Sequence, residues 1–135
     1  MLFNVLLFSL FSTSFFLDLC KGEETYTFAI IPKSTSDPYH IDVIKGCEDK
    51  AAELENASCI ALGPTSYDEY KANPDLQADI LDEIVQEGLV HGVSIAVQYI
   101  SEKMEASIND AVDAGIPVLT YDSDAPNTKR SAYIG

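Results

Sequence analysis

The stretch "YTFAIIPKSTSDPYHIDVIKG", Tyr26 to Gly46, joins two elements of different period. Its first part is apolar and β-branched, which predicts a buried strand from Thr27 to Ile31. After the polar joint from Pro32 to Tyr39, apolar residues return at helical spacing, which predicts a helix from about Tyr39 to Glu55. The stretch therefore predicts a strand, a polar joint and a helix, the first part of a βαβ unit.

The same alternation continues to the end of the chain. Two further helices are predicted, one beginning at Asn73-Pro74 with Asn73 as N-cap and ending at Gly88, the other capped by Ser101 and ending near Gly115. Strands that are apolar on both faces and joined by helices are typical of a parallel sheet with helices on both sides. We therefore expect an α/β fold with a doubly wound parallel sheet. The remaining predicted strands are Ser58 to Leu62, Gly92 to Val97, Ile116 to Thr120 and Ala132 to Ile134.

The composition of residues 1–22 indicates a targeting segment that is not part of this fold. The nearly continuous apolar run from Leu2 to Leu17 is short for a membrane span and fits the hydrophobic region of a secretory signal. A signal peptide cut near Cys20 is the main interpretation, and an uncleaved membrane anchor is the alternative. Lipidation at Cys20 is disfavoured, because Leu19 occupies the place where a small residue is wanted. Either interpretation places the expected domain, residues 23–135, outside the cytoplasm.

The charge of the chain excludes some partners. The net charge is −14, and it stays −14 from Glu23 onward because one Lys and one Asp precede that residue. Such an acidic surface repels phosphate backbones, so nucleic acid is a poor candidate partner.

Two cysteines, Cys47 and Cys59, remain in the expected domain. Cys47 lies on the apolar stripe of the first helix with Ile44, Ala51 and Leu54, and Cys59 lies in the following strand. Export to an oxidising compartment would allow a disulfide between them if helix and strand pack together. The alternative, two small buried apolar side chains, stays open.

In an open α/β sheet, ligands bind beyond the carboxyl ends of the strands, so the strand-to-helix joints are the places to search. Neither GxGxxG nor GxxxxGK[ST] follows any predicted strand, which argues against nucleotide binding. The first strand ends in Pro32-Lys33 rather than in paired acids, which argues against a phospho-acceptor domain. His40 has no GxSxG partner for hydrolysis, and the His and acidic residues lack metal-ligand spacing.

The joints instead carry hydrogen-bonding groups together with aromatic rings. Carboxylates, an ammonium group and amides satisfy the hydroxyls of a polyhydroxylated ligand, while aromatic faces stack on its C–H surface. The interpretation depends on these groups converging at one edge of the sheet. They are Lys33, Ser34, Ser36, Asp37, Tyr39 and His40 after the first predicted strand, Gln98 after the strand Gly92 to Val97, and Tyr121, Asp122, Ser123 and Asp124 after the strand Ile116 to Thr120.

From about Tyr26 to Gly135 the chain resembles the periplasmic sugar-binding proteins of bacterial ABC transporters, in the ribose-binding-like group that includes autoinducer-2-binding proteins. The matching segments are "FAIIPKSTSDPYHIDVIKGCEDKAAEL", "GPT" with "QADILDEIVQEGLVHGVSIAV", and "AVDAGIPVLTYDSDAPNTKRSAYIG". The resemblance implies a periplasmic-binding-protein-like fold in which two lobes close over a ligand. The chain matches the first lobe only, so we expect weak or undetectable binding by this lobe alone.

The resemblance also implies the residues that contact the ligand. Ser123 stands where many sugar binders have Arg, so "DSD" is closer to the autoinducer-2 pattern. No cofactor and no metal are implied. The implied contacts are Lys33, Asp37, Tyr39, His40, Gln98, Asp122 and Ser123.

The function implied is non-catalytic: an exported solute-binding protein that takes up a small sugar or autoinducer-2-like ligand and delivers it to an ABC permease. An extracytoplasmic ligand-sensing domain of a signalling receptor is the alternative. A secreted α/β hydrolase is a third, and it requires that His40 act in a turnover.

Overall fold

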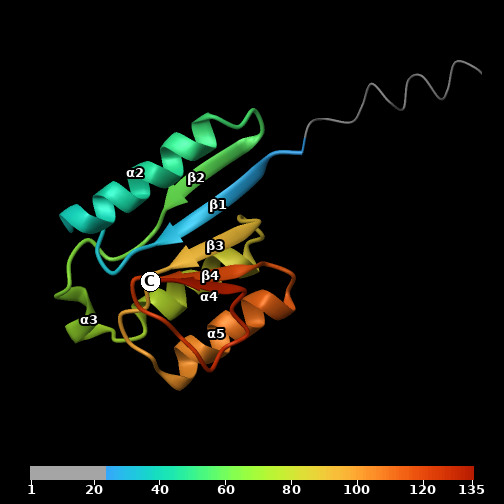
Figure 1. The fold of residues 1–135 in the computed structure, drawn as a ribbon. Coiled ribbons are helices and arrows are strands. Elements are labelled where there is room, and N and C mark those ends of the chain that lie inside the picture. The colour runs from blue at the N-terminus through green and yellow to red at the C-terminus, as the bar shows by residue number, and fades with distance from the viewer. Residues whose placement is uncertain (1–23) are drawn as a thin grey trace, which may run out of the picture.

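A computed structural model describes residues 24–135, and the predicted signal peptide and Cys20 lie outside these residues. Five parallel strands form one sheet in the order β2-β1-β3-β4-β5 (Figure 1). The expected α/β fold with a parallel sheet is confirmed. The strands are β1 (Tyr26–Ile31), β2 (Ala57–Ala61), β3 (Gly92–Ile95), β4 (Val118–Tyr121) and β5 (Ala132–Ile134).

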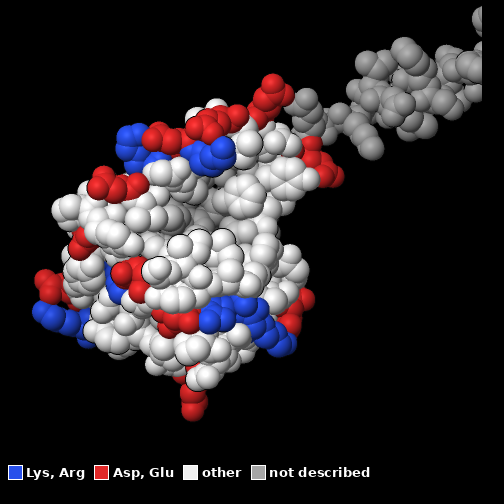
Figure 2. All heavy atoms as spheres, viewed as in Figure 1, with Lys and Arg blue, Asp and Glu red and all other residues white. Residues whose placement is uncertain are grey.

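The helices cover both faces of the sheet. Helix α2 (Pro38–Ala52) lies over β1 and β2 on one face, and α4 (Leu76–Gln86) and α5 (Glu102–Asp113) lie on the other (Figure 1). A short helix, α3 (Glu69–Ala72), interrupts the predicted loop between β2 and α4. Figure 2 shows few charged side chains over the middle of the α2 face and mixed charges along its rim.

The larger hydrophobic core lies between the sheet and the pair α4 and α5. Ile31, Ile95 and Val118 from the strands meet Leu81 and Ile108 from the helices, all fully buried. Burying each such side chain contributes about 1.5–3 kcal/mol. The α2 face has a smaller buried cluster, formed by Ile30, Ala96 and Tyr121.

Local caps set the helix starts. Ser101 Oγ accepts a hydrogen bond from the Met104 N–H at 3.1 Å, so the cap predicted for this helix is confirmed. Asp37 caps α2 in the same way, accepting from the Tyr39 N–H at 2.9 Å, and Pro38 occupies the first turn, where its missing N–H costs nothing.

The predicted helix start at Asn73-Pro74 is wrong. Helix α4 begins at Leu76, because the Asn73 side chain accepts from the Asp75 N–H at 3.1 Å and forms a turn ahead of the helix. Leu54 was expected on the buried stripe of α2, but the helix ends at Ala52 and Leu54 is 47% exposed. The predicted limits of β5 are confirmed, as are the end of β1 and the start of β3, and the remaining strand and helix limits shift by one to three residues.

Cys47 and Cys59 are joined by a disulfide, with Cα atoms 5.9 Å apart. The bond fixes the middle of α2 to the middle of β2. Within residues 24–135, no helix combines the length and apolar character needed to cross a bilayer.

Candidate ligand-binding site

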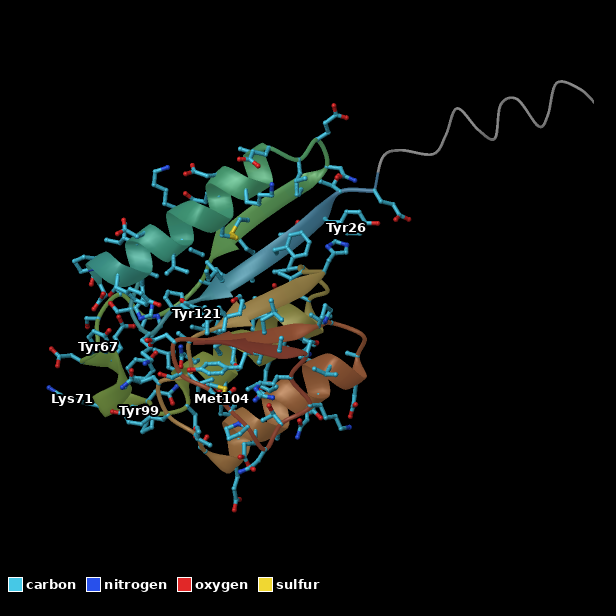
Figure 3. All side chains as sticks on the ribbon, viewed as in Figure 1. Tyr26, Tyr67, Lys71, Tyr99, Met104 and Tyr121 are labelled. Carbon is cyan, nitrogen blue, oxygen red and sulfur yellow. A yellow bond between two sulfur atoms is a disulfide. The ribbon has the colours of Figure 1, made fainter. Side chains whose placement is uncertain are left out.

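The order of the strands places a crevice at the carboxyl edge of the sheet. The chain leaves β1 toward α2 on one face and leaves β3 toward α5 on the other. Such a switch point opens a space between the two joints, which is where ligands of α/β sheets bind. Figure 3 shows Tyr67, Tyr99 and Tyr121 at this end of the molecule, toward which the strand arrows point.

Lys33, Asp122 and Ser123 meet at this edge, although 89 residues separate Lys33 from Asp122. Lys33 Nζ lies 2.6 Å from Asp122 Oδ2 and also donates to Ser123 Oγ. The Lys33 and Asp122 side chains are 19% and 35% exposed, so the pair is partly shielded yet open to a ligand. The hydrogen bond from Lys33 holds the pKa of Asp122 below its ordinary value, which keeps the carboxylate ionised.

The backbone holds Asp122 in an unusual position. Its φ of 59° is in the left-handed region, which Asp adopts more readily than most residues. The Asp122 N–H donates to the Ile134 carbonyl at 3.0 Å, and the Tyr133 hydroxyl donates to the Asp122 carbonyl at 3.2 Å. Strand β5 therefore helps to direct this carboxylate toward Lys33.

Three rings form an aromatic group beside the ion pair. The His40 ring makes edge-to-face contacts with Tyr39, at 5.1 Å between centroids, and with Tyr121, at 5.9 Å. His40 and Tyr121 are buried, whereas Tyr39 is 53% exposed and presents its ring to solvent. Burial lowers the pKa of His40 and raises that of Tyr121, so both side chains are neutral near pH 7. The Tyr121 hydroxyl, 3.3 Å from His40 Nδ1, can then donate to it.

Asp37 is held at the rim of the site. One carboxylate oxygen caps α2, and the other accepts from the Tyr67 hydroxyl at 3.1 Å. Tyr67 is 46% exposed and extends the aromatic rim toward α3. Tyr70 of α3 packs edge-to-face on Tyr99, and its buried hydroxyl has no hydrogen-bond partner among residues 24–135.

A cavity of about 390 Å³ lies against Tyr39, Tyr121 and Asp122. Its size is in the range of small-molecule sites. It is lined by Tyr39, Val43, Ser94, Tyr121, Asp122, Tyr133, Ile134 and Gly135.

Gln98 contributes differently from the other expected contacts. Its backbone N–H donates to Gln77 Oε1 at 2.8 Å, and no side-chain hydrogen bond of Gln98 is found within residues 24–135. Gln77 is fully buried on α4, and its Nε2 donates to the carbonyls of Pro32 at 3.0 Å and Ala96 at 2.8 Å. Gln77 therefore ties the end of β1 to the end of β3, directly behind Lys33.

Asp124, grouped with the polar joint residues by sequence, has a structural role instead. Its carboxylate accepts from both Nε and Nη2 of Arg130 and from the Thr120 hydroxyl. These bonds hold its pKa far below the ordinary value. Asp124 thus closes the loop between β4 and β5 rather than facing a ligand.

Tyr67, Gln77 and Tyr133 are site residues that sequence reasoning missed. Tyr67 lies in the joint between the predicted strand Ser58 to Leu62 and the next helix, so its position could have signalled it, whereas Tyr133 lies within a predicted strand. Gln77 carries no such signal, because a Gln beside an apolar helical stripe ordinarily faces solvent. Among residues 24–135, no cluster of three or more His, Cys, Asp or Glu could hold a metal ion.

Comparison with known proteins assigns the family. Residues 28–135 match the family model described as periplasmic binding protein domain. The chain belongs to this family. The resemblance to sugar-binding proteins of ABC transporters is thereby confirmed at the level of the family. A search of curated proteins found no match.

Solved structures of binding proteins share the fold of this periplasmic binding protein domain. A structure titled XylFII molecule is 30% identical with a TM-score of 0.65, over 82% of this chain and 38% of that one. GanP, a glucose-galactose binding protein from Geobacillus stearothermophilus, is 28% identical with a TM-score of 0.67, over 84% and 38%. An ABC transporter solute binding protein from Clostridium phytofermentas, solved with bound L-rhamnose, is 27% identical with a TM-score of 0.65, over 81% and 32%. The chain thus spans 32–38% of the length of these proteins.

Proposed function

We propose that this chain supplies one wall of the ligand cleft of an exported solute-binding protein, and that the ligand is a small polyhydroxylated molecule, a sugar or an autoinducer-2-like compound. The observation that carries the proposal is the Lys33–Asp122 ion pair, which lies at the carboxyl edge beside the exposed ring of Tyr39. Membership of a family whose relatives bind sugars supports solute binding and a non-catalytic role.

The chemistry of the site suits hydroxyl groups. Within residues 24–135, Asp122 Oδ1 accepts no hydrogen bond, so it can accept from a ligand hydroxyl. The Lys33 ammonium has a third N–H beyond those directed at Asp122 and Ser123, so it can donate to the same or a neighbouring hydroxyl. The Tyr39 ring offers a flat face for the C–H surface of a sugar. A donor, an acceptor and a stacking face at one point match the needs of a polyol.

Domain closure would complete the site in the whole protein. A cleft wall alone supplies part of the ligand contacts, and a second wall adds the rest and excludes water. In the whole protein we propose that closure around the ligand creates the form that an ABC permease recognises. His40 is buried between the rings of Tyr39 and Tyr121, which supports a packing role for its side chain.

The test is the thermal stability of the protein with and without monosaccharides such as D-xylose, D-galactose and L-rhamnose. A sugar that binds the native state alone raises the melting temperature, and the rise grows with the logarithm of its concentration above the dissociation constant. We expect at least one sugar to stabilise the native protein and not the Asp122→Asn variant, whereas Asp110→Asn, an exposed carboxylate on α5, keeps the effect. Equal responses of the two variants would contradict the proposed site. Hydrolysis of nitrophenyl glycosides that depends on His40 would favour an enzyme instead.

A further inference from the structure

The turn that carries Asp122 is a strained point of the backbone. Within residues 24–135, Asp122 is the sole residue other than glycine with a positive φ, at 59°. The Ser123 N–H donates to the Tyr121 carbonyl at 2.5 Å, so Asp122 is the central residue of a three-residue turn. A γ-turn with positive φ is rare and strained, and it persists only where the surrounding structure holds it. Contacts on either side of Asp122 must therefore hold it in this conformation.

The contacts that follow the turn converge on one carboxylate, that of Asp124. Arg130 donates to it from two nitrogens, Nε to Oδ1 and Nη2 to Oδ2, the second at 2.7 Å. The Thr120 hydroxyl donates to Oδ1 at 2.7 Å, and the Ala125 N–H donates to the same atom at 2.8 Å. Thr120 is fully buried in β4, and Arg130 lies two residues before the start of β5. Asp124 therefore ties the end of β4 to the start of β5.

These contacts constrain the backbone on both sides of Asp122. Asp122 lies midway between Thr120 and Asp124, whose side chains are hydrogen-bonded to each other, so the turn cannot open unless that bond breaks. The Asp122 N–H donates to the Ile134 carbonyl of β5, and Arg130 fixes the chain that enters β5. Neither Asp124 nor Arg130 is among the residues that line the cavity of the candidate site. They act on Asp122 through the backbone.

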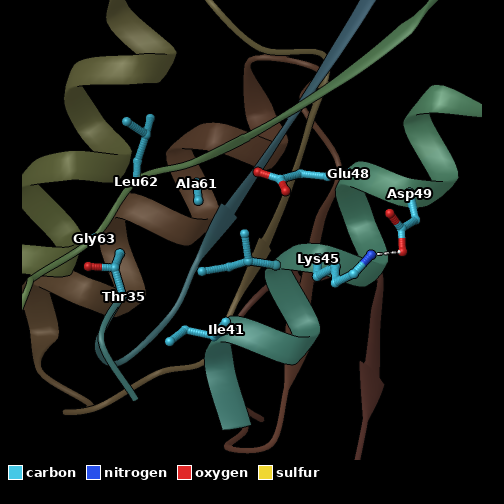
Figure 4. A pocket seen from close by; sticks show the side chains of 9 residues that line it. Thr35, Ile41, Lys45, Glu48, Asp49, Ala61, Leu62 and Gly63 are labelled. Carbon is cyan, nitrogen blue, oxygen red and sulfur yellow. Dashed lines mark hydrogen bonds and ion pairs between the residues drawn. The ribbon is translucent and has the colours of Figure 1, made fainter. Parts of the chain in front are cut away.

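The ion pair between Arg130 and Asp124 suits the task of holding one geometry. Two N–H groups of an Arg that bind both oxygens of a carboxylate fix its orientation as well as its distance, which a Lys cannot do. The Arg130 and Asp124 side chains are 22% and 23% exposed. The helix pair Lys45 and Asp49, drawn in Figure 4, is 65% and 63% exposed. Because shielding from water strengthens an ion pair, the Arg130 pair is better able to offset the strain of the turn.

We propose that Arg130, acting through Asp124, positions the Asp122 carboxylate for the ligand. This role rests on the proposed function, because it concerns the alignment of a ligand acceptor in that same site. Residues other than glycine prefer negative φ, so without the Arg130 pair the turn is free to relax. A relaxed turn directs the Asp122 side chain away from Lys33. Arg130 is thus a positioning residue, which affects the ligand without lining the cavity.

The test is the pKa of the Asp122 carboxyl group, measured by NMR titration of the ¹³C-labelled protein without any sugar. In the native protein the hydrogen bond from Lys33 holds this pKa below its ordinary value, and the nearby His40 on α2 also lowers it. Arg130→Met should raise it, because the released carboxylate loses Lys33. Asp124→Ala should raise it too, although the loss of a negative charge by itself lowers the pKa of a neighbouring acid. A rise in both variants therefore separates positioning from a direct effect of charge.

Two further variants complete the test. Lys45→Met is the matched control, since it removes one cation from an exposed ion pair in a groove that shares no residue with the candidate site (Figure 4). It should leave the pKa of Asp122 unchanged. Arg130→Lys keeps the charge but loses the two-nitrogen contact, so it should raise this pKa in part. It supplies the comparison with Asp124→Ala if Arg130→Met does not fold.

Three results would overturn the proposal. The first is a pKa of Asp122 that rises in Arg130→Met and falls in Asp124→Ala, as charge alone would cause. The second is an unchanged pKa in both variants, with native amide spectra. The third is a sugar that binds Arg130→Met as tightly as the native protein, where a loss of about tenfold is expected for one weakened hydrogen bond to a charged group. The first two need no sugar, so they are independent of the proposed function, which Asp122→Asn tests separately.

Discussion

Replacing Gln77 by Leu should destabilise the domain strongly, although the two side chains are similar in size. Gln77 is fully buried and makes three hydrogen bonds, to the Pro32 carbonyl, the Ala96 carbonyl and the Gln98 N–H. At about 1 kcal/mol each, their loss costs about 3 kcal/mol, and each backbone group left buried without a partner adds to this cost. Such a loss is a large fraction of the stability of an ordinary domain, which is about 5–15 kcal/mol.

The assay is urea unfolding followed by circular dichroism, with Gln86→Leu as the control. Gln86 lies at the end of the same helix and is exposed, so its replacement should change the free energy of unfolding by less than about 0.5 kcal/mol. The reasoning is refuted if Gln77→Leu and Gln86→Leu unfold at the same urea concentration. That result would mean that the Gln77 amide does not hold the end of β1 to the end of β3.

Three further perturbations test other parts of the account. Breaking the disulfide with Cys47→Ala and Cys59→Ala should cost about 3 kcal/mol, because the cross-link spans 12 residues, and an unchanged melting temperature would argue against a role in stability. Burial lowers the pKa of His40, so the unfolded chain binds more protons below the ordinary value of 6.5. The free energy of unfolding should therefore fall as the pH drops from 7 to 5, and a His40→Gln variant with the same slope would contradict this cause. Asp122→Asn should cost only about 0.5–1 kcal/mol, because its ion pair with Lys33 is partly exposed, and a larger loss would show a structural role.

The order of strands and helices could be predicted because burial controls it locally. Residues Ala29 to Ile31 are buried in β1, and the Ser101 cap requires only one hydroxyl and one N–H three residues away. The start of α4 could not be predicted in this way. Asn73 followed by Pro74 is compatible with a helix N-cap and with a turn. Which of the two forms depends on which backbone N–H donates to the Asn73 side-chain oxygen, and here it is that of Asp75.

In the candidate site, too, some features could be predicted from the sequence and others could not. The sequence places Lys33 and Asp122 at strand ends, and parallel topology then brings such ends together at one edge. Which groups pair across that edge depends on side-chain reach and on long-range packing. For this reason Asp122 pairs with Lys33 whereas Asp124 pairs with Arg130, although the two acids are neighbours in "YDSD". The role of Gln77 follows from tertiary packing alone.

The central claim is that a polyhydroxylated ligand binds at the carboxyl edge of the sheet, and sugar titration of the ¹⁵N-labelled protein followed by NMR tests it most directly. This method detects dissociation constants of about 1–10 mM, which correspond to only about 3–4 kcal/mol of binding energy and suit a single cleft wall. The account predicts that at least one sugar shifts the amide signals of Lys33, Tyr39 and Asp122 while those of α5 stay in place. Sugar-dependent shifts confined to other surfaces, with the signals of Lys33, Tyr39 and Asp122 unchanged, would contradict it.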